Sequence, residues 1–410
     1  MVRPRSTFGQ VFGVPEFRAL WAAQILSVAG DQLARVAITL LVFRPTRSTL
    51  LAAVAFAASV VPTFLGGLLL SGLADRWPRH QVMITCDLVR AAIVGVMALP
   101  WIPLAARVGL LVLLTMVGAP FTSARAALYP DILPGDHYVL GTAVTLTTMQ
   151  FAQVIGFAAG GAVVSLFGVR TSLLADAGTF IVSALITRLW VRPRPVAAPG
   201  RQQETSAGRA GRPAGGLRSG LGLVFTSPAL RTPMLLGWLS AFYNVPEGIA
   251  APLGGALGGG DVAVGLIMAA AAFGASVGAV AFGRLVEPRQ RLRWMNRLAA
   301  LSCATLMLFW FRPPLPAALV VLAVSGLFDC YQLAANAAFV STVPPAQRSQ
   351  AFGIAQGGMN LGQGAAMIGA GAAAQHYAPG MVIAVTGLLG VIAALSVALT
   401  SRNQVRGGRV

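Results

Sequence analysis

The sequence predicts an all-α membrane protein with twelve transmembrane helices, in two six-helix bundles related by a pseudo-twofold axis. The first observation is composition: of 410 residues, 56% are hydrophobic and 10% are charged, and the mean hydropathy is +0.74. Soluble globular domains carry roughly 25% charged residues. The second observation is that twelve apolar segments approach the length of about 20 residues that a spanning helix requires. The third observation is a weak internal repeat, in which the second half of the chain resembles the first.

The apolar segments follow one another with short polar connections. We expect an N-terminal bundle over residues 1–191, a cytoplasmic linker over 192–227 and a C-terminal bundle over 228–410. The linker is rich in Arg, Gly, Pro and Ser and lacks helical periodicity, which predicts a flexible, solvated segment. The predicted spans are 17–43, 48–71, 81–100, 108–129, 139–167, 171–191, 229–253, 262–283, 294–311, 315–341, 351–377 and 380–400.

The charge distribution predicts the orientation. The formal net charge is +18, and every one of the 30 basic residues is Arg. Most of them fall at the two termini, in the linker and in residues 71–80 and 284–293. Under the positive-inside rule these segments lie in the cytoplasm, which gives a multi-pass protein of the cell membrane with both termini inside. Because the Arg residues cluster between apolar runs rather than along a polar face, we expect no nucleic-acid partner.

The internal repeat has an offset of 210 to 213 residues. VPEFR at 14–18 lies opposite SPALR at 227–231, and Leu133 and Pro134 lie opposite Val343 and Pro344. Any one match could arise because apolar sequence of low complexity aligns with itself, but several matches occur in order. Carriers built from two such halves bind substrate between them near the midplane and expose the site to either side in turn.

A short charged segment, SGLADRWPRH at 71–80, interrupts the apolar sequence after the second span. It resembles the signature of the major facilitator superfamily, Gly-x-Leu-Ala-Asp-Arg-x-Gly-Arg-Arg/Lys. A degenerate second copy occupies 283–292. GDQLARVAITLLVF in the first span and YPDILPGDHYVLGTA after the fourth are similar to the bacterial macrolide and siderophore exporters, a subgroup of drug:proton antiporters. The residues that match the signature are Leu73, Ala74, Asp75, Arg76 and Arg79. The sequence departs from it at three positions: Ser71 replaces the first Gly, which follows one place later as Gly72, Pro78 replaces the second Gly, and His80 replaces the last basic residue.

The resemblance implies a cytoplasmic gate. Gly72 permits a tight turn, and Asp75 is the implied gate residue, which can meet a helix N-terminus or an Arg such as Arg125. Arg76 and Arg79 either take part in this gate or only set the membrane topology.

Four acids lie inside apolar segments, at Asp31, Asp176, Glu247 and Asp329. Each costs about 2.5–3.5 kcal/mol at a helix centre unless it is paired, protonated or in contact with water. In the family, spans one, four, seven and ten line the cavity. The resemblance therefore implies that Asp31, Glu247 and Asp329 face the transport path and couple transport to protons. Span six is peripheral, so we expect a structural role for Asp176.

Two charged pairs follow from helical spacing. Asp31 and Arg35 are four residues apart and share a helix face, so they form either an ion pair or part of the site. Asp87 and Arg90 in the third span form a further possible pair, for which we expect a structural role.

Polar and aromatic side chains within the spans are candidates for substrate contact, although each could instead make a hydrogen bond between helices. The three His and three Cys residues lack the spacing of a metal site, so no metal or cofactor is expected. No nucleotide-binding or hydrolase motif is present, so we expect a protein that is not an enzyme. The cavity candidates are Gln32, Gln150, Gln153, Tyr243, Asn244, Gln332, Asn360 and Gln363.

These observations favour a monomeric secondary transporter that exports amphipathic small molecules, drugs or natural products, in exchange for protons. Its partners would be a small-molecule substrate, protons and the lipid bilayer. An importer of a nutrient or siderophore is the alternative within the same class, because alternating access runs in either direction. A non-transporting receptor or a lipid-modifying enzyme is the alternative from another class.

Overall fold

The computed structural model describes residues 8–70, 77–194, 227–344 and 348–407, which are helical and contain no strand. Most of the predicted linker, residues 195–226, lies outside these ranges. The same holds for the predicted gate residues Gly72, Asp75 and Arg76.

The chain divides into two compact units, which are described separately. Unit 1 comprises Met1–Leu41 and Ala58–Gln203, and unit 2 comprises Val42–Ala57 and Glu204–Val410. The end of the first span and most of the helix after it therefore group with the C-terminal half. One contact that places them there is a hydrogen bond of 2.6 Å from the Thr49 hydroxyl to the carbonyl oxygen of Gly371.

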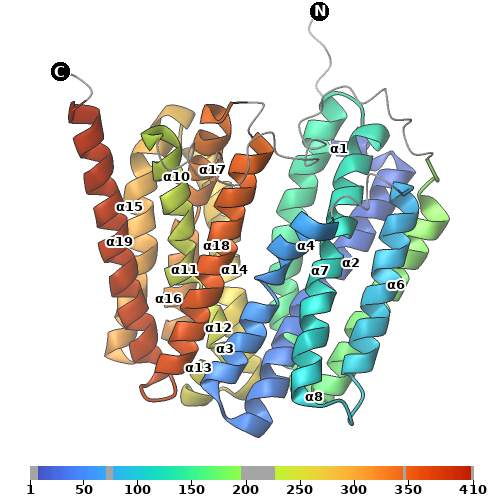
Figure 1. Ribbon diagram of the computed structural model, residues 1–410, viewed down its shortest axis with the longest axis horizontal. Coiled ribbons are helices and arrows are strands. Elements are labelled where there is room, and N and C mark those ends of the chain that lie inside the picture. Colours follow the sequence, from blue (N-terminus) through green and yellow to red (C-terminus); the bar gives the residue numbers. More distant parts are fainter. Residues whose placement is uncertain (1–7, 71–76, 195–226, 345–347, 408–410) are drawn as a thin grey trace, which may run out of the picture. The chain divides into compact units, whose positions relative to one another are not determined.

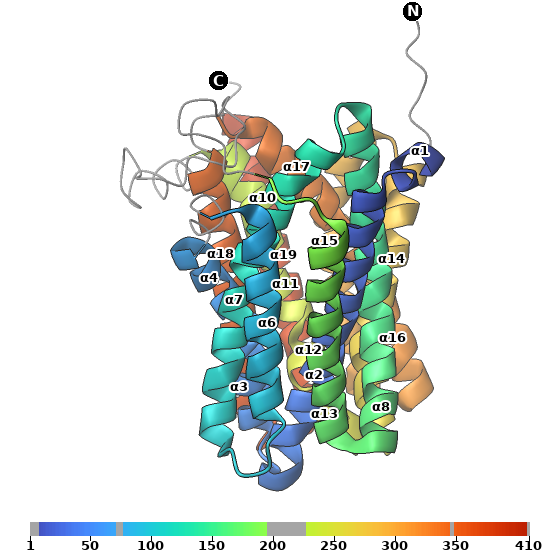
Figure 2. The ribbon, with the colours of Figure 1, turned by 90° about the vertical axis from the view of Figure 1, so that its right-hand side faces the viewer.

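Unit 1 is built from long helices. Helix α8 covers the fifth and sixth predicted spans, and Gly168 interrupts it with a φ of 82°, a conformation that favours glycine. Figures 1 and 2 show α6 running alongside α7, and α6 also packs against α8. The helices are α1 (Phe8–Phe12), α2 (Pro15–Thr46, whose last turn belongs to unit 2), α4 (Pro62–Leu70), α6 (Arg79–Met97), α7 (Leu104–Ile132) and α8 (Asp136–Trp190).

Unit 2 contains long helices and two spans that are broken into shorter pieces. Predicted span seven is divided into α10 to α13, and predicted span ten into α16 and α17. The helices are α3 (Thr49–Ala58), α10 (Pro228–Trp238), α11 (Ser240–Tyr243), α12 (Val245–Gly248), α13 (Ala250–Ala256), α14 (Gly260–Leu285), α15 (Pro288–Leu306), the 3₁₀ helix η1 (Met307–Phe311), α16 (Leu315–Phe328), α17 (Tyr331–Thr342), α18 (Arg348–Ala373) and α19 (Pro379–Gly407).

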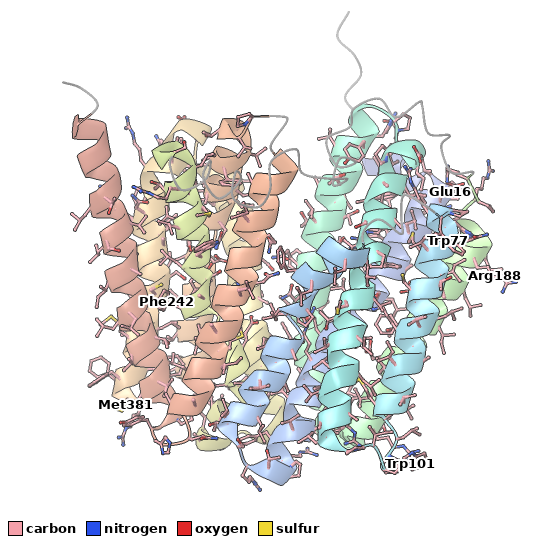
Figure 3. All side chains as sticks on the ribbon, viewed as in Figure 1. Glu16, Trp77, Trp101, Arg188, Phe242 and Met381 are labelled. Atoms are coloured by element: carbon pink, nitrogen blue, oxygen red, sulfur yellow. The ribbon has the colours of Figure 1, made fainter. Side chains whose placement is uncertain are left out.

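The described helices have the length and surface of membrane spans. Eight helical stretches among them are long and apolar enough to cross a bilayer. Trp77 and Trp101 flank α6 at its two ends, and their side chains are exposed (Figure 3). Tryptophan is enriched at both membrane–water interfaces, so this placement is typical of a helix that spans the bilayer. The chain is a multi-pass membrane protein.

Glycine residues bring the helices of each unit into close contact. In unit 1, a Cβ atom at Gly156 of α8 would lie 2.6 Å from the carbonyl oxygen of Ala29 in α2, and one at Gly160 would lie 3.1 Å from Leu33 Cα. In unit 2, Gly274 and Gly278 of α14 face the backbone of α16 in the same way. Small residues four apart allow this approach, which replaces the hydrophobic driving force that is missing between helices in lipid.

We predict that Gly156→Ala destabilises the protein by about 1–3 kcal/mol, because backbone atoms of α2 occupy the space of the added methyl group. Thermal unfolding of the purified protein in detergent measures the effect. The matched control is Gly95→Ala in α6, where no atom lies within 4 Å of the added methyl group. Equal unfolding temperatures for the two variants would contradict the packing described here.

Candidate functional site

A cluster of buried charges lies within unit 1, around Arg90 of α6. The Arg90 guanidinium donates a hydrogen bond of 2.6 Å to Asp31 of α2 and lies 3.8 Å from the carboxylate of Asp87, one turn earlier on α6. The exposed fraction of the residue is 6% for Arg90 and 0% for Asp87. Charges so far from water require partners. Here α6 contributes the cation Arg90, and α2 contributes the anion Asp31.

Neutral side chains complete the surroundings of this cluster. Ser183 of α8 donates a hydrogen bond of 2.6 Å to Asp87, and Arg90 donates one of 3.4 Å to the Ser27 hydroxyl. The guanidinium carbon of Arg90 lies 4.0 Å from the ring centre of Phe180, which is a cation–π distance. Sequence reasoning missed Ser183, Phe180 and Ser27, because serine and phenylalanine in an apolar segment carry no distinguishing pattern.

Two expectations for this region need correction or extension. Asp31 pairs with Arg90 on the neighbouring helix, and it forms no ion pair with Arg35. Helical spacing places Asp31 and Arg35 on one face but does not say which helix lies opposite. The Asp87–Arg90 pair predicted from the sequence is present, and it belongs to the same cluster as Asp31.

Asp176 of α8 joins this cluster from another side. Its exposed fraction is 0%, and the charged groups that act on it are Asp31 and Arg90. The Thr179 hydroxyl lies 3.3 Å from the Asp176 Oδ1 atom, and the Oδ2 atom has no hydrogen-bond partner among the described residues. The structural role expected for Asp176 stays a prediction, and its carboxyl group lies against Gly30 of α2, the residue before Asp31.

A second polar cluster lies within unit 2, where spans seven and ten are broken. Asp329 follows α16 directly, and it accepts a hydrogen bond from the Tyr243 hydroxyl at the end of α11. Gln332 Nε2 donates to the Tyr243 oxygen at 2.8 Å and to the carbonyl oxygen of Gly237 at 3.1 Å. The Tyr331 hydroxyl donates to the carbonyl oxygen of Leu236 at 2.9 Å.

The helix breaks explain these contacts. Interrupting a helix inside a membrane leaves backbone carbonyl groups without intrahelical partners, and hydrocarbon offers none. At the end of α10 the carbonyl groups of Leu236 and Gly237 accept the N–H of Leu239, and side chains of α17 add a second donor to each of them. Discontinuous helices are typical of substrate and ion sites in transporters. Tyr243, Gln332 and Asp329, each predicted for the site, are brought together here.

The other predicted cavity residues have varied positions. Gln363 of α18 donates a hydrogen bond of 2.9 Å to Ser240, and Asn360 accepts one of 3.2 Å from Gln356. Gln32 is buried beside the Asp31 position. The remaining candidates are Asn244, Glu247 and Gln153, which are half-buried, and Gln150, which is exposed.

Of the predicted gate residues, Arg79 and Arg125 are described. Arg79, the first residue of α6, forms an ion pair of 2.7 Å with Asp131 of α7 and donates a hydrogen bond of 2.8 Å to the carbonyl oxygen of Ala127. The guanidinium of Arg125 lies 5.8 Å from the ring centre of Phe121. Sequence reasoning missed Asp131 as the partner of Arg79, although Asp131 lies in the YPDILPGDHYVLGTA stretch.

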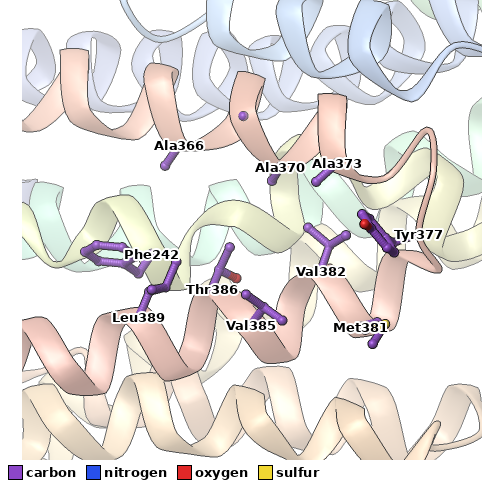
Figure 4. Close-up of a pocket in the computed structure, with 11 residues that line it drawn as sticks. Phe242, Ala366, Ala370, Ala373, Tyr377, Met381, Val382, Val385, Thr386 and Leu389 are labelled. Atoms are coloured by element: carbon purple, nitrogen blue, oxygen red, sulfur yellow. The ribbon is translucent and has the colours of Figure 1, made fainter.

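A cavity of about 420 Å³ in unit 2 is distinct from both polar clusters. Small side chains of α18, including Ala366 and Ala370, face α19 across it, and Phe242 and Tyr377 lie toward opposite ends (Figure 4). Its lining is almost entirely carbon, and none of the predicted cavity residues contributes to it. The cavity therefore fits an apolar group rather than a charged one.

The fold is that of a multi-pass helical membrane protein, and comparison with known proteins identifies its family. The model of the Major Facilitator Superfamily matches residues 20–246 and 245–408. The chain therefore belongs to the Major Facilitator Superfamily, and it is a transporter of small molecules rather than an enzyme.

Two relatives fall within the exporter subgroup that the sequence resembles. The multidrug efflux pump Tap of Mycolicibacterium fortuitum is 26% identical over 320 residues, which cover 74% of this chain and 75% of Tap. The enterobactin exporter EntS of Escherichia coli O1:K1 is 26% identical over 310 residues, which cover 72% of this chain and 71% of EntS.

Solved structures agree with this chain in fold. A POT family transporter in complex with 5-aminolevulinic acid superposes with a TM-score of 0.74 at 10% identity, covering 98% of both chains. A bacterial homologue of the human lysosomal transporter Spinster, in an inward-facing and unoccupied conformation, has a TM-score of 0.71 at 16% identity and covers 95% of this chain and 97% of its own. At these identities the likeness shows the fold alone.

We predict that Arg90→Met lowers the stability of the protein by about 3–5 kcal/mol, because it leaves buried carboxylates without a cation. The double variant Arg90→Met/Asp31→Asn should recover part of this loss. Thermal unfolding in detergent measures both.

The control for this prediction is Arg44→Gln, in a partly exposed ion pair with Asp261. Its effect should stay within about 1 kcal/mol. A loss for Arg90→Met as small as that of the control would refute the central place of Arg90.

Proposed function

We propose that this protein is a proton-coupled secondary transporter of the cell membrane that exports amphipathic small molecules by alternating access. The observation that carries the proposal is the presence of half-buried carboxyl groups within the spans, in both units. Asp31 lies beside Arg90 in unit 1, and Asp329 accepts a hydrogen bond from Tyr243 in unit 2. Ionisable groups inside a membrane are costly and mark substrate, ion or proton pathways.

Proton coupling follows from the chemistry of these groups. A carboxyl group in an apolar site can exchange one proton with water when the site opens, and its charge then changes by one unit. That change alters its attraction for a neighbouring cation such as Arg90 or for a cationic cargo. We propose Asp31, Glu247 and Asp329 as the coupling groups, with Arg35 near the transport path.

The cargo class is inferred from two sources. The relatives at 26% identity are named as a multidrug efflux pump and an enterobactin exporter. The polar groups of unit 2 are few and lie amid apolar side chains, a composition that suits drug-like ligands. We propose that Tyr243, Gln332 and Asn244 contact the cargo from unit 2, and that Gln32, Gln150 and Gln153 do so from unit 1. From α18, Asn360 and Gln363 complete the set.

The architecture proposed with this function has twelve spans in two six-helix bundles related by a pseudo-twofold axis. The internal repeat and the short Arg-poor loops on one side support it, and the positive-inside rule then places both termini in the cytoplasm. The protein would act as a monomer. The segment around Asp75 would form a cytoplasmic gate, and Arg79, paired with Asp131, would hold the end of α6 to α7 there.

We predict that inverted membrane vesicles containing the protein accumulate ethidium or tetraphenylphosphonium when their interior is acidified, because export from the cytoplasm becomes uptake into inverted vesicles. An uncoupler should abolish the accumulation. Vesicles without the protein are the control. Accumulation that resists the uncoupler would exclude proton antiport, and movement in the opposite direction would indicate an importer.

We further predict that Asp31→Asn or Asp329→Asn abolishes proton-driven accumulation while exchange of labelled for unlabelled cargo continues, because exchange needs no net proton transfer. Glu247→Gln is tested in parallel. The matched control is Glu16→Gln, since Glu16 pairs with Arg192 and Arg194 away from the clusters. Wild-type accumulation in the Asp31, Asp329 and Glu247 variants would remove these residues from the coupling mechanism.

A further inference from the structure

The charged cluster of unit 1 contains more acids than its central cation can neutralise. Asp31, Asp87 and Asp176 all act on the single guanidinium of Arg90. An Asp31 carboxylate oxygen lies 2.6 Å from the Arg90 guanidinium, and an Asp87 carboxylate oxygen lies 3.8 Å from it. Asp87 also accepts a hydrogen bond from Ser183. Arg125 of α7 also acts on Asp87 and Arg90, but it forms no ion pair among the described residues.

Asp176 is the acid of this cluster that forms no ion pair among the described residues. Its side chain is fully buried, and its Oδ2 atom has no hydrogen-bond donor within the described chain. The Thr179 hydroxyl has one hydrogen, and it lies nearer to the carbonyl oxygen of Asp176, at 2.7 Å, than to the Oδ1 atom, at 3.3 Å. An ionised carboxylate in such a place would have one long hydrogen bond from Thr179 and no ion pair, which is a costly arrangement of a buried charge.

The position of Asp176 ties it to the helix that carries Asp31. A Cβ atom at Gly30 of α2 would overlap the Asp176 Oδ1 and Thr179 Oγ1 atoms. The carboxyl group of Asp176 therefore lies directly against the α2 backbone, one residue before Asp31. A change of charge on Asp176 acts on the same Arg90 that Asp31 binds.

We propose that Asp176 is a further proton-binding group of unit 1, which acts on the ion pair of Asp31. With a proton on Asp176, Arg90 pairs with Asp31. When the Asp176 carboxyl group releases that proton, its carboxylate competes with Asp31 for Arg90 and Asp31 is freed. The release of one proton thereby changes the ion-pair partner of Arg90 from Asp31 to Asp176. Asp31 has a side-chain exposure of 28%, and the proton enters and leaves the cluster past it. The role of Asp176 in transport rests on the function proposed above. The presence of a proton on Asp176 does not depend on that function.

The first test detects the proton directly. Infrared spectroscopy of the purified full-length protein at neutral pH should show the carbonyl band of a protonated carboxyl group, and Asp176→Asn should remove one carboxyl equivalent of it. The control Glu16→Gln should leave the band unchanged. Persistence of the full band in Asp176→Asn would overturn the proposal.

A second variant keeps the proposal testable if Asp176→Asn does not fold. In Asp31→Asn, Arg90 loses its first partner and should pair with Asp176, so the same band should disappear although the Asp176 side chain is present. An unchanged band in Asp31→Asn would overturn the competition between the two acids for Arg90.

The transport assay separates this inference from the proposed function. In proteoliposomes, Asp176→Asn should lose at least ten-fold in proton-driven ethidium accumulation and retain ethidium exchange, whereas a merely structural role would reduce both together. Loss of both activities in a folded variant would overturn the role of Asp176 in coupling. Absence of proton-driven transport by the wild-type protein would refute the proposed function, while the infrared band would still decide the bound proton.

Discussion

Hydrocarbon offers no hydrogen-bond partner and no counter-ion, and this constraint governs every part of the structure. It requires the backbone within the spans to be helical, because only a helix satisfies its peptide groups within one segment. It also requires each buried charge to find partners within the protein. Arg90 is the clearest case, since α2 supplies Asp31, α6 itself supplies Asp87, and α8 supplies the ring of Phe180. Ser183 of α8 in turn donates a hydrogen bond to Asp87.

The two units meet this constraint in different ways. Unit 1 keeps long helices and gathers charged side chains around one guanidinium. Unit 2 interrupts two spans, and Tyr331 and Gln332 donate further hydrogen bonds to the carbonyl groups of Leu236 and Gly237 at one of the breaks. Both arrangements give polar groups inside the spans partners within the protein, where hydrocarbon would offer none.

Close helix packing keeps these clusters in place. The glycines of α8 that face α2 leave no room for a side chain, so α2 is held at a fixed distance from the Asp176 region. Gly30 extends the same contact to the carboxyl group of Asp176. Because packed helices shift between discrete arrangements rather than deform continuously, a change in the charge of one carboxyl group at this contact can favour one arrangement over another.

The sequence by itself determined the class of protein and the family. Apolar segment lengths predicted the helices, the 71–80 segment indicated the superfamily, and isolated acids in apolar segments marked Asp31 and Asp329 as functional candidates. Helical periodicity also identified the Asp87–Arg90 pair, because both residues lie on one helix, one turn apart.

Only the tertiary structure decided which helices face each other, and with them the partners of the acids. Asp31 binds Arg90 rather than Arg35, Arg79 binds Asp131, and Asp176 lies against Gly30 of α2. Helical spacing gives the face on which a side chain lies, but the neighbour of that face depends on packing between distant segments, which a single sequence does not encode in any local pattern.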